Sequence, residues 1–427
     1  MRIVLTVFLL QFLSIGPAIA LTLDDALDTA LRNNPQIAQA DAQLKASEAR
    51  TGIARAPFWP TLGANYSYWD ADRDPNLATS DLSSTSAYAR LNLFNGGSNW
   101  FRLDAAEKSQ AAAEWRKLSV IADIILDLRR SYIEVLRAEQ SLETANKSLE
   151  LLERQYRDTE LRLEQGLLAR NDLLRVAVER STAKQNVVIA EGGLTVARRN
   201  LGRVMGVPLD ASDKLAEVTL REFHPAAEDE LLEEMLTKRS ELKYLHNQLM
   251  AIEAERKAVY GNFLPDVDMS HSYERFGNRS FPDSDDPDYD KDSITMLQAS
   301  WTLFSGFETR YELALRKQEA LALKEEIRAT ENLLRVQLAS ALEDYRIART
   351  NLETAQTSLA LAEENYRITE NRYKAQVATT VDFLDSQEFL TRTRNEEVKA
   401  QYDLYNAEAV IDRVLERSFQ GYAPENK

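Results

Sequence analysis

The sequence contains no cysteine, only three histidines, and few residues that break helices: 14 glycines and 11 prolines among 427 residues. Without cysteine there is neither a disulfide framework nor a thiol to carry an N-terminal lipid. The three histidines are scattered, so they show no spacing typical of a metal site. No P-loop or nucleophile elbow occurs. We therefore expect a protein that is not an enzyme and that needs no cofactor or metal.

Long apolar runs are also missing after the N-terminus. Residues 3–15 form an apolar run between a charged start and an A-x-A end at residues 18–20, which is the pattern of a secretory signal peptide. This run is too short to cross a bilayer as a helix. No later stretch approaches 18 uninterrupted apolar residues. We expect residues 1–20 to be a signal peptide and the mature chain to lie outside the cytoplasm without a helical anchor.

Basic residues are outnumbered, with 52 Lys and Arg against 68 Asp and Glu. An acidic surface repels the phosphates of nucleic acid, which is therefore not an expected partner. Residues 98–165 and 307–420 contain neither glycine nor proline and are rich in Ala, Leu, Glu, Arg and Gln, a composition typical of long helices. At about 1.5 Å per residue, the first of these segments would form a helix about 100 Å long.

The chain repeats itself at an offset of 210 residues. Residues 142–162 read LETANKSLELLERQYRDTELR and residues 352–372 read LETAQTSLALAEENYRITENR, with 13 of 21 positions identical. Around both segments, apolar and small side chains recur at alternating steps of three and four, from Ile121 to Leu163 and from Leu334 to Tyr373. This spacing predicts one long coiled-coil helix in each half of the chain.

Short segments of alternating polarity precede each long helix. They lie at residues 60–68 and 86–93 in the first half, and at 265–269 and 297–303 in the second. Strands of about ten residues with one apolar face are typical of transmembrane barrels. Four strands cannot satisfy their two edges in lipid, so several chains would share one barrel. A pair of hairpins on a soluble domain explains the alternation equally well, and the periodicity alone also fits a cytoskeletal or membrane-bending coiled coil.

The order of these elements, repeated once, resembles the TolC-type outer-membrane factor family. The resemblance covers the chain from Leu23 to about Arg413. It is carried by three pairs of short motifs, which enter the hairpins, leave the hairpins and form the helix turns: Phe58–Leu62 (FWPTL) and Phe263–Val267 (FLPDV), Leu91–Gly97 (LNLFNGG) and Trp301–Gly306 (WTLFSG), Gly166–Asp172 (GLLARND) and Val381–Asp385 (VDFLD).

Such a resemblance implies a mainly α fold with a small β part. Duplicated long coiled-coil helical hairpins and four transmembrane strands per chain would assemble as a homotrimer, giving a 12-strand β-barrel continued by a periplasmic α-helical barrel. The implied divisions are a first repeat at 21–210, an equatorial linker at 211–227, a second repeat at 228–418 and a tail at 419–427. Each repeat would hold a β-hairpin (60–94 and 265–304) and a helix turn (near 166–171 and 376–381).

In function, the resemblance implies the outer-membrane exit duct of a tripartite efflux or type I secretion system. Its partners would be a periplasmic adaptor protein, an inner-membrane RND or ABC pump, and outer-membrane lipid. Export of protein or polysaccharide in place of small compounds is an alternative that the sequence leaves open. A secreted coiled-coil scaffold is the alternative outside the class of channels.

The resemblance places the functional residues at the two helix turns, which would form the periplasmic entrance. Asp382 and Asp385 would point into it, so three chains would place six carboxylates around one narrow hole. Such a ring would favour cations and raise the carboxylate pKa values by mutual repulsion. Asp172 occupies the repeat position of Asp382. An aspartate in a first helical turn is also stabilised by the helix dipole, so a plain capping role remains an alternative.

The other candidate residues would shape or hold these turns. Gly166 is expected to cap the preceding helix, and Thr379 and Thr380 to form the second turn. Arg170 or Arg175 would pair with Asp382, Asp385 or another acid, although exposed ion pairs contribute only about 0 to 1 kcal/mol each. The acidic loop at 283–292 could hold Ca²⁺ or lipopolysaccharide-bridging cations, but its acids lack a recognised ligand spacing, and a solvated loop explains it as well.

Overall fold

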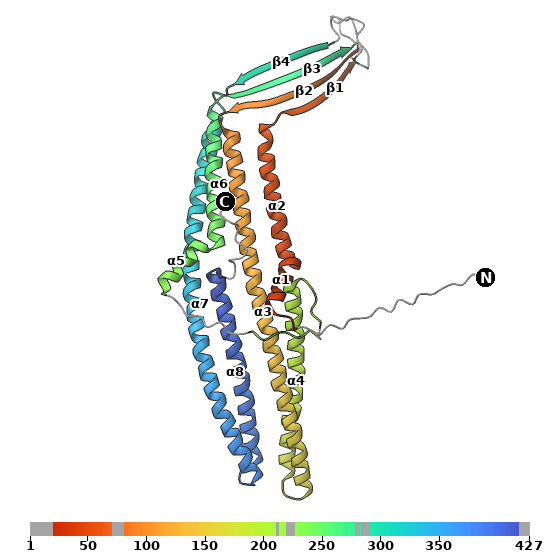
Figure 1. Cartoon of the computed structure of the whole chain (residues 1–427), viewed down its shortest axis with the longest axis vertical. Helices are drawn as coiled ribbons and strands as arrows, with labels where there is room; N and C mark the ends of the chain where they lie inside the picture. The colour runs from red at the N-terminus through yellow and green to blue at the C-terminus, as the bar shows by residue number, and fades with distance from the viewer. Residues whose placement is uncertain are drawn as a thin grey trace, which may run out of the picture. The chain divides into compact units, whose positions relative to one another are not determined.

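The computed structural model describes residues 20–70, 81–210, 213–218, 227–277, 282 and 291–417. The expected signal peptide up to residue 19, most of the acidic loop and the tail lie outside these residues. Among the described residues, eight α-helices, two short 3-10 helices and four strands follow one another (Figure 1): α1 (Leu23–Asn33), α2 (Pro35–Arg55), η1 (Ala56–Phe58), β1 (Thr61–Asp70), β2 (Asp81–Asn95), α3 (Ser98–Glu164), α4 (Arg170–Met205), α5 (Glu228–Lys238), α6 (Ser240–Tyr260), η2 (Gly261–Phe263), β3 (Asp266–Gly277), β4 (Lys291–Ser300), α7 (Glu308–Lys374) and α8 (Thr380–Val414).

The element order confirms the predicted duplication and the mainly helical fold. The series from α1 to α4 returns as α5 to α8, and the two long helices α3 and α7 each contain 67 residues. The offset is 205 residues at α2 and α6 and 210 residues at α3 and α7, because five extra residues precede β4 in the second copy. No described helix is long and apolar enough to cross a membrane.

The chain forms two compact units that cut across the two repeats. The helical-hairpin unit comprises residues 1–38, 120–237 and 334–427, and the sheet unit comprises residues 39–119 and 238–333. Helices α3 and α7 contribute residues to both units. Each unit therefore combines equivalent parts of both repeats, an arrangement that a division of the sequence into successive repeats does not predict.

Within the sheet unit, the strands form an antiparallel meander in the order β1-β2-β3-β4. Strand β2 is the longest of the four. Its residues 81–90 pair with β1, and its residues 83–95 pair with β3. The pairing predicted for each hairpin is confirmed. Strand β4, however, ends at Ser300 and not near residue 304. Ser300 lies opposite Asp266, so the next pair would need an amide from Pro265, which has none.

The register separates the side chains of the sheet into two faces. The first, called the apolar face, carries these residues on the four strands: Leu62, Ala64, Ala87, Ala89, Leu91, Met269, Leu297 and Ala299. The second, called the polar face, carries mainly small and polar side chains: Asn65, Ser67, Ser84, Ser86, Asn92, Asp268, Ser270 and Gln298. The Asn92 side chain donates to Asp268 Oδ1 over 3.1 Å. The alternation predicted from the sequence is therefore present at these positions, whereas the first part of β4 places Ile294 and Met296 on the polar face and Lys291, Ser293 and Thr295 on the apolar face.

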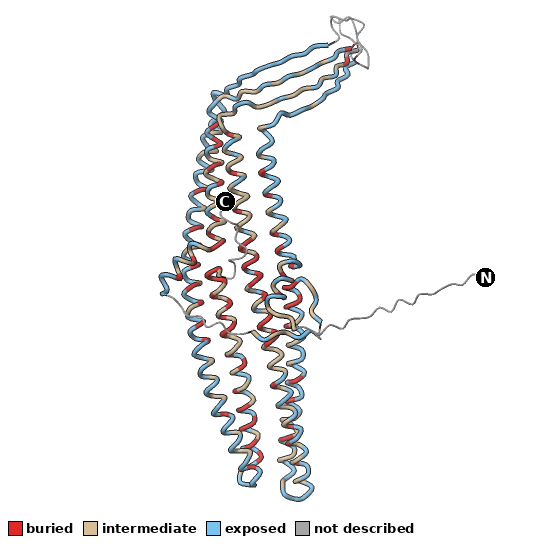
Figure 2. Tube along the Cα trace, viewed as in Figure 1, coloured by how far each residue is buried: buried red, intermediate tan, exposed pale blue. Residues whose placement is uncertain are grey.

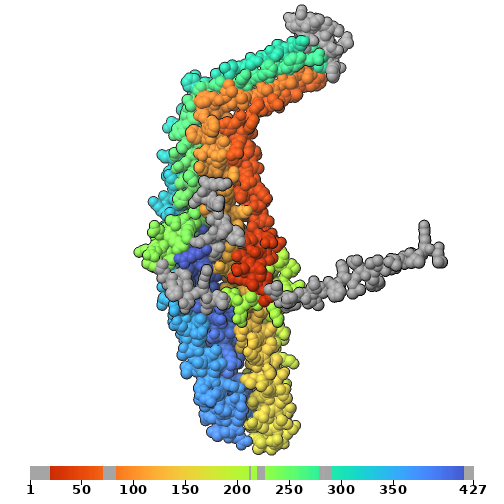
Figure 3. All heavy atoms as spheres, in the orientation of Figure 1, coloured from red at the N-terminus to blue at the C-terminus, as the bar shows by residue number. Residues whose placement is uncertain are grey.

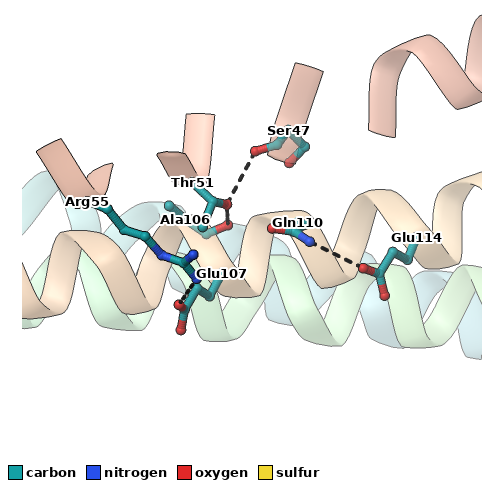
Figure 4. A network of polar contacts seen from close by, with 7 residues as sticks. All are labelled: Ser47, Thr51, Arg55, Ala106, Glu107, Gln110 and Glu114. Atoms are coloured by element: carbon teal, nitrogen blue, oxygen red, sulfur yellow. Dashed lines mark hydrogen bonds and ion pairs between the residues drawn. The ribbon is translucent and has the colours of Figure 1, made fainter. Parts of the chain in front are cut away.

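Within the sheet unit, close backbone contacts and polar contacts hold α2, the start of α3 and α6 together. Gly96 has a φ of 66°, and a Cβ there would lie 2.3 Å from the carbonyl oxygen of Gly261. The Ser98 hydroxyl donates to the Ala258 carbonyl over 2.6 Å. Between α2 and α3, Arg55 pairs with Glu107 and Thr51 donates to the Ala106 carbonyl (Figure 4). These contacts fix the start of the long helix against its neighbours.

In the helical-hairpin unit, α3 lies beside α4 and α7 lies beside α8 (Figures 1 and 3). Every seam position predicted between Ile121 and Leu163 and between Leu334 and Tyr373 is buried or half-buried, and burial in Figure 2 follows stripes along these helices. Tyr132 is fully buried. Its hydroxyl lies 2.7 Å from each of two carbonyl oxygens, of Leu21 and Ala216, and burial raises the pKa of Tyr132 to about 12.

Candidate functional site at the two helix turns

The first turn joins α3 to α4 through a left-handed residue. Gly166 has a φ of 73°; its amide donates to the Leu163 carbonyl over 2.9 Å, and the Leu167 amide donates to the Arg162 carbonyl over 2.9 Å. These two bonds satisfy carbonyls at the end of α3 in a Schellman arrangement. A Cβ on Gly166 would meet nothing within 4 Å. The glycine is therefore favoured by its backbone conformation and not by lack of space.

The second turn has the same backbone but different residues. Gln376, the repeat equivalent of Gly166, has a φ of 63°. Its amide donates to the Tyr373 carbonyl over 3.0 Å, and the Val377 amide donates to the Arg372 carbonyl over 2.8 Å. A residue with a Cβ pays about 1 kcal/mol or more in this left-handed region. The second turn is thus the more strained of the two.

This difference is part of a wider asymmetry between the repeats. All positive-φ residues of the described chain fall at equivalent positions 210 residues apart. The first repeat has glycine at each of them, whereas the second keeps glycine only once. The four pairs are Gly96 with Gly306, Gly97 with Phe307, Gly166 with Gln376, and Gly206 with Glu416. The left-handed backbone is therefore present in both repeats, although three of the four positions in the second repeat carry a residue with a Cβ.

We expect Gln376→Gly to stabilise the second turn by about 1 kcal/mol, because glycine removes the left-handed penalty at the cost of some unfolded-state entropy. The matched change in the first turn, Gly166→Ala, should destabilise that turn by about 1 kcal/mol, since only conformation disfavours the methyl group there. Hydrogen exchange at the Val377 and Leu167 amides measures both changes locally. Equal protection in Gln376→Gly and the wild type would show that the second turn is not strained.

Asp382 lies in the first turn of α8 and forms a capping box with Thr379. The Thr379 amide donates to Asp382 Oδ2 over 2.9 Å, the Thr379 hydroxyl donates to the same oxygen over 2.8 Å, and the Asp382 amide donates to the hydroxyl over 3.1 Å. Hydrogen bonds from the Thr379 backbone and side chain, in that order of weight, lower the pKa of Asp382. Within one chain, the capping role accounts for this carboxylate.

The corresponding cap in the first turn is weaker. Asp172 Oδ2 accepts from the Ala169 amide over 3.3 Å, but alanine has no hydroxyl to complete the box. Thr380, which follows the capping threonine of the second turn, is buried. The two equivalent aspartates therefore face equivalent backbone amides, and only Asp382 is held by three hydrogen bonds.

The depressed pKa of Asp382 predicts how acid acts on the second turn. Stabilisation by the capping box is fully present above the unfolded-state pKa near 3.8 and is lost as the pH falls through the lower folded-state pKa. In the monomeric chain, where no ring of carboxylates forms, we expect hydrogen exchange at the Thr379 amide to accelerate, relative to the Ala169 amide, only below about pH 4. Asp382→Asn should remove this extra acid dependence. If the acceleration instead begins near pH 6, the carboxylate is not held as described.

Asp385 and Arg175 are brought together across the two helical hairpins. Both line a cleft of about 290 Å³ between α4 and α8, with apolar walls that include Val178 and Leu384. Both side chains are exposed. No hydrogen bond or ion pair connects either one, or Arg170, to Asp382 or to another acid among the described residues. The predicted ion-pair latch is therefore absent from the single described chain, although Arg175 and Asp385 share one cleft.

The second turn is supported from inside by aromatic contacts that sequence patterns did not single out. Phe383 is buried and stacks on Tyr373 with ring centroids 4.9 Å apart. The Gln155 side chain donates to the Tyr373 hydroxyl over 3.1 Å, which connects α3 to α7. Because Tyr373 and Thr159 lie on the predicted seams, their burial was expected, but their polar partners could not be read from spacing.

Metal-binding groups do not accompany these acids. Among the described residues, no cluster of three or more histidine, aspartate or glutamate side chains is arranged to hold a metal ion. What the site presents is exposed carboxylates and arginines at the ends of long helical hairpins. Such an arrangement can attract or repel ions.

The chain therefore belongs to a structural class with duplicated long helical hairpins and a four-stranded sheet that has one apolar face. The family model for the outer membrane efflux protein matches residues 26–207 and 231–416. The chain is 23% identical to the outer membrane protein TolC of Escherichia coli, over 87% of this chain and 77% of TolC. It is 25% identical to the alkaline protease secretion protein AprF of Pseudomonas aeruginosa, over 91% of this chain and 83% of AprF.

Solved structures show the same fold. The Campylobacter jejuni CmeC outer membrane channel superposes with a TM-score of 0.82 at 15% identity, covering 94% of this chain and 87% of CmeC. Because the family model spans most of the chain, the protein belongs to the outer membrane efflux protein family. The predicted family and its outer-membrane location are thereby confirmed.

Proposed function

We propose that three copies of this chain form one duct across the outer membrane, with the helical hairpins extending into the periplasm. Substrate would enter at the two helix turns and leave through the barrel, and the chain itself would catalyse no reaction. A periplasmic adaptor protein and an inner-membrane RND or ABC pump would supply the substrate. The family membership and the architecture of both units support this proposal.

The observation that carries the proposal is the sheet with two unpaired edges. Among the described residues, strands β1 and β4 each pair with only one neighbour, and every residue of β4 is exposed. A membrane-embedded sheet must satisfy these backbone groups by closing. Because the four strands alternate in direction, β4 of one chain can pair antiparallel with β1 of the next. Three chains would supply twelve strands, an even number as such barrels require.

Exposed apolar side chains on the long helices support assembly as well. In the helical-hairpin unit, Val188, Ile189, Val336 and Leu361 each expose more than 60% of their surface in the single chain. Apolar surface that is exposed in the single chain is available for burial against a neighbouring chain. Neighbouring chains would cover them in a ring of helical hairpins.

The class of substrate that the duct transports is a separate question. The relative AprF is named for the secretion of a protease, whereas the family is named for efflux. Both activities need the same tube. Protein export therefore remains the second candidate, and transport with each class of inner-membrane pump would separate the two.

The absence of native cysteine allows a direct test of the shared barrel. Asn65→Cys on β1 would be combined in turn with a cysteine at Ile294, Met296 or Gln298 on β4, all on the same face of the sheet. We expect at least one pair to link chains covalently into trimers on oxidation, while Asn65→Cys alone should give no covalently linked trimers. If all three pairs remain monomeric in the outer membrane, β1 and β4 do not meet between chains.

A further inference from the structure

Cross-strand rows cover the apolar face of the sheet, and they change in character toward the hairpin loops. Nearest the helices, Val267 and Ala299 are register partners, and the next row is also apolar, with Leu91, Met269 and Leu297. The next two rows mix small, aromatic and polar side chains. The row after these contains Tyr66, Thr85, Arg275 and Lys291, and it is followed by a row with Tyr68, Ser83 and Gly277 and by the pair Asp70 and Asp81. A basic pair therefore lies near the loop end of a face that is apolar beside the helices.

Arg275 on β3 and Lys291 on β4 are direct register partners in the second hairpin. Both side chains are exposed, and neither forms an ion pair with another described residue. Like charges placed directly opposite each other destabilise a sheet. The nearest acids of the described strands, Glu274 and Asp292, are also register partners but lie on the polar face, where they cannot neutralise the pair.

The position of the pair along the strands fits a membrane boundary. Nine residues separate Asp266, at the start of β3, from Arg275, which is about 30 Å along a strand at about 3.3 Å per residue and about 20 to 25 Å along the membrane normal at a tilt of about 40°. A tilted strand thus reaches the edge of an apolar band about 25 Å tall. Tyr66, Tyr68 and Tyr273 share this end of the apolar face, and tyrosine is enriched where bilayers meet water. A cation there costs far less than at the bilayer centre.

We propose that Arg275 and Lys291 together bind a phosphate group of the phosphorylated glycolipid that forms the outer leaflet. This inference rests on the proposed function, because it requires the apolar face to contact lipid. A phosphate offers several acceptor oxygens to a guanidinium and an ammonium at once, and its negative charge relieves the repulsion between the two cations. The adjacent tyrosine rings would contact the sugar and upper acyl region.

The test measures binding of bis-phosphorylated lipid A to the full chain in detergent by native mass spectrometry, which also counts the chains in each particle. We expect Arg275→Gln with Lys291→Gln to weaken binding about tenfold, and the monophosphorylated lipid to bind the wild type several-fold more weakly. The charge-preserving exchange, Arg275→Lys with Lys291→Arg, should bind within about twofold of the wild type. Arg90→Gln, which removes a cation from the polar face, should also leave binding unchanged.

The outcomes separate this proposal from the duct itself. A trimeric double variant that binds lipid A as tightly as the wild type would overturn the phosphate site and leave the duct intact. Equal loss of binding in Arg90→Gln would overturn it too, because any cation would then serve. A wild-type chain that stays monomeric in detergent and binds no lipid A would overturn both proposals.

Discussion

Leu297→Arg should abolish stable insertion of the protein into lipid, whereas Gln298→Arg, one residue further along β4, should be tolerated. Leu297 exposes 69% of its surface on the apolar face, and Gln298 lies on the polar face. An arginine on the lipid-facing side of a membrane strand costs about 2 kcal/mol or more away from the interfaces. In a trimer, this unfavourable free energy would apply once for each of the three chains. Recovery of trimers from outer membranes, compared between the two variants, measures the effect.

This comparison also separates a membrane sheet from a soluble one. On a water-exposed sheet, both arginines would be solvated, and surface substitutions of this kind change stability by less than about 0.5 kcal/mol. Both variants sit on the same strand, so any effect on pairing between chains is shared. Equal recovery of Leu297→Arg and Gln298→Arg would contradict the assignment of the apolar face to lipid.

Asp382→Asn combined with Asp385→Asn should lower the preference of the duct for cations several-fold without preventing trimer formation. Six carboxylates at one narrow entrance would attract cations through their combined field. Replacing both acids on each chain removes all six charges and keeps the side-chain shapes. The ratio of cation to anion permeability in a planar bilayer measures the change.

The single variants separate the helix-capping role of Asp382 from the contribution of both acids to ion selectivity. Asp382 caps α8 through Thr379, so Asp382→Asn should also loosen the turn, while Asp385→Asn should affect selectivity alone. A control removes two exposed acids of α7 about 30 Å or more from the turn, Asp344→Asn with Glu353→Gln. Unchanged selectivity in the double aspartate variant, or an equal change in the control, would remove the carboxylate ring from the account.

The sequence predicted the elements with the strongest periodic signals. The segment without glycine or proline at 98–165 became α3, whereas the one at 307–420 became α7 and α8, separated by the turn at Gln376. Alternating polarity indicated the four strands, although β4 alternates only at its end, where Leu297 and Ala299 face away from Gln298 and Ser300. The end of β4 was missed because it depends on Pro265 across the sheet, a partner that the strand's own sequence does not reveal.

Of the candidate site, the positions were predictable but the contacts were not. The repeat placed Asp172 and Asp382 at equivalent turns, and both lie in the first turn of a helix. That Asp382 is held by Thr379 depends on backbone geometry at the start of α8. The left-handed conformation of Gln376 was hidden, because glutamine gives no signal for positive φ, although its alignment with Gly166 could have indicated it.

The central claim is that three chains form one open-ended tube through a membrane. Planar-bilayer conductance of the detergent-purified mature protein, with mass determination of the same particles, tests it most directly. The account predicts stable particles of three chains that pass a cation-selective current. A monomer that stays soluble without detergent and never conducts would contradict it and would favour a secreted scaffold.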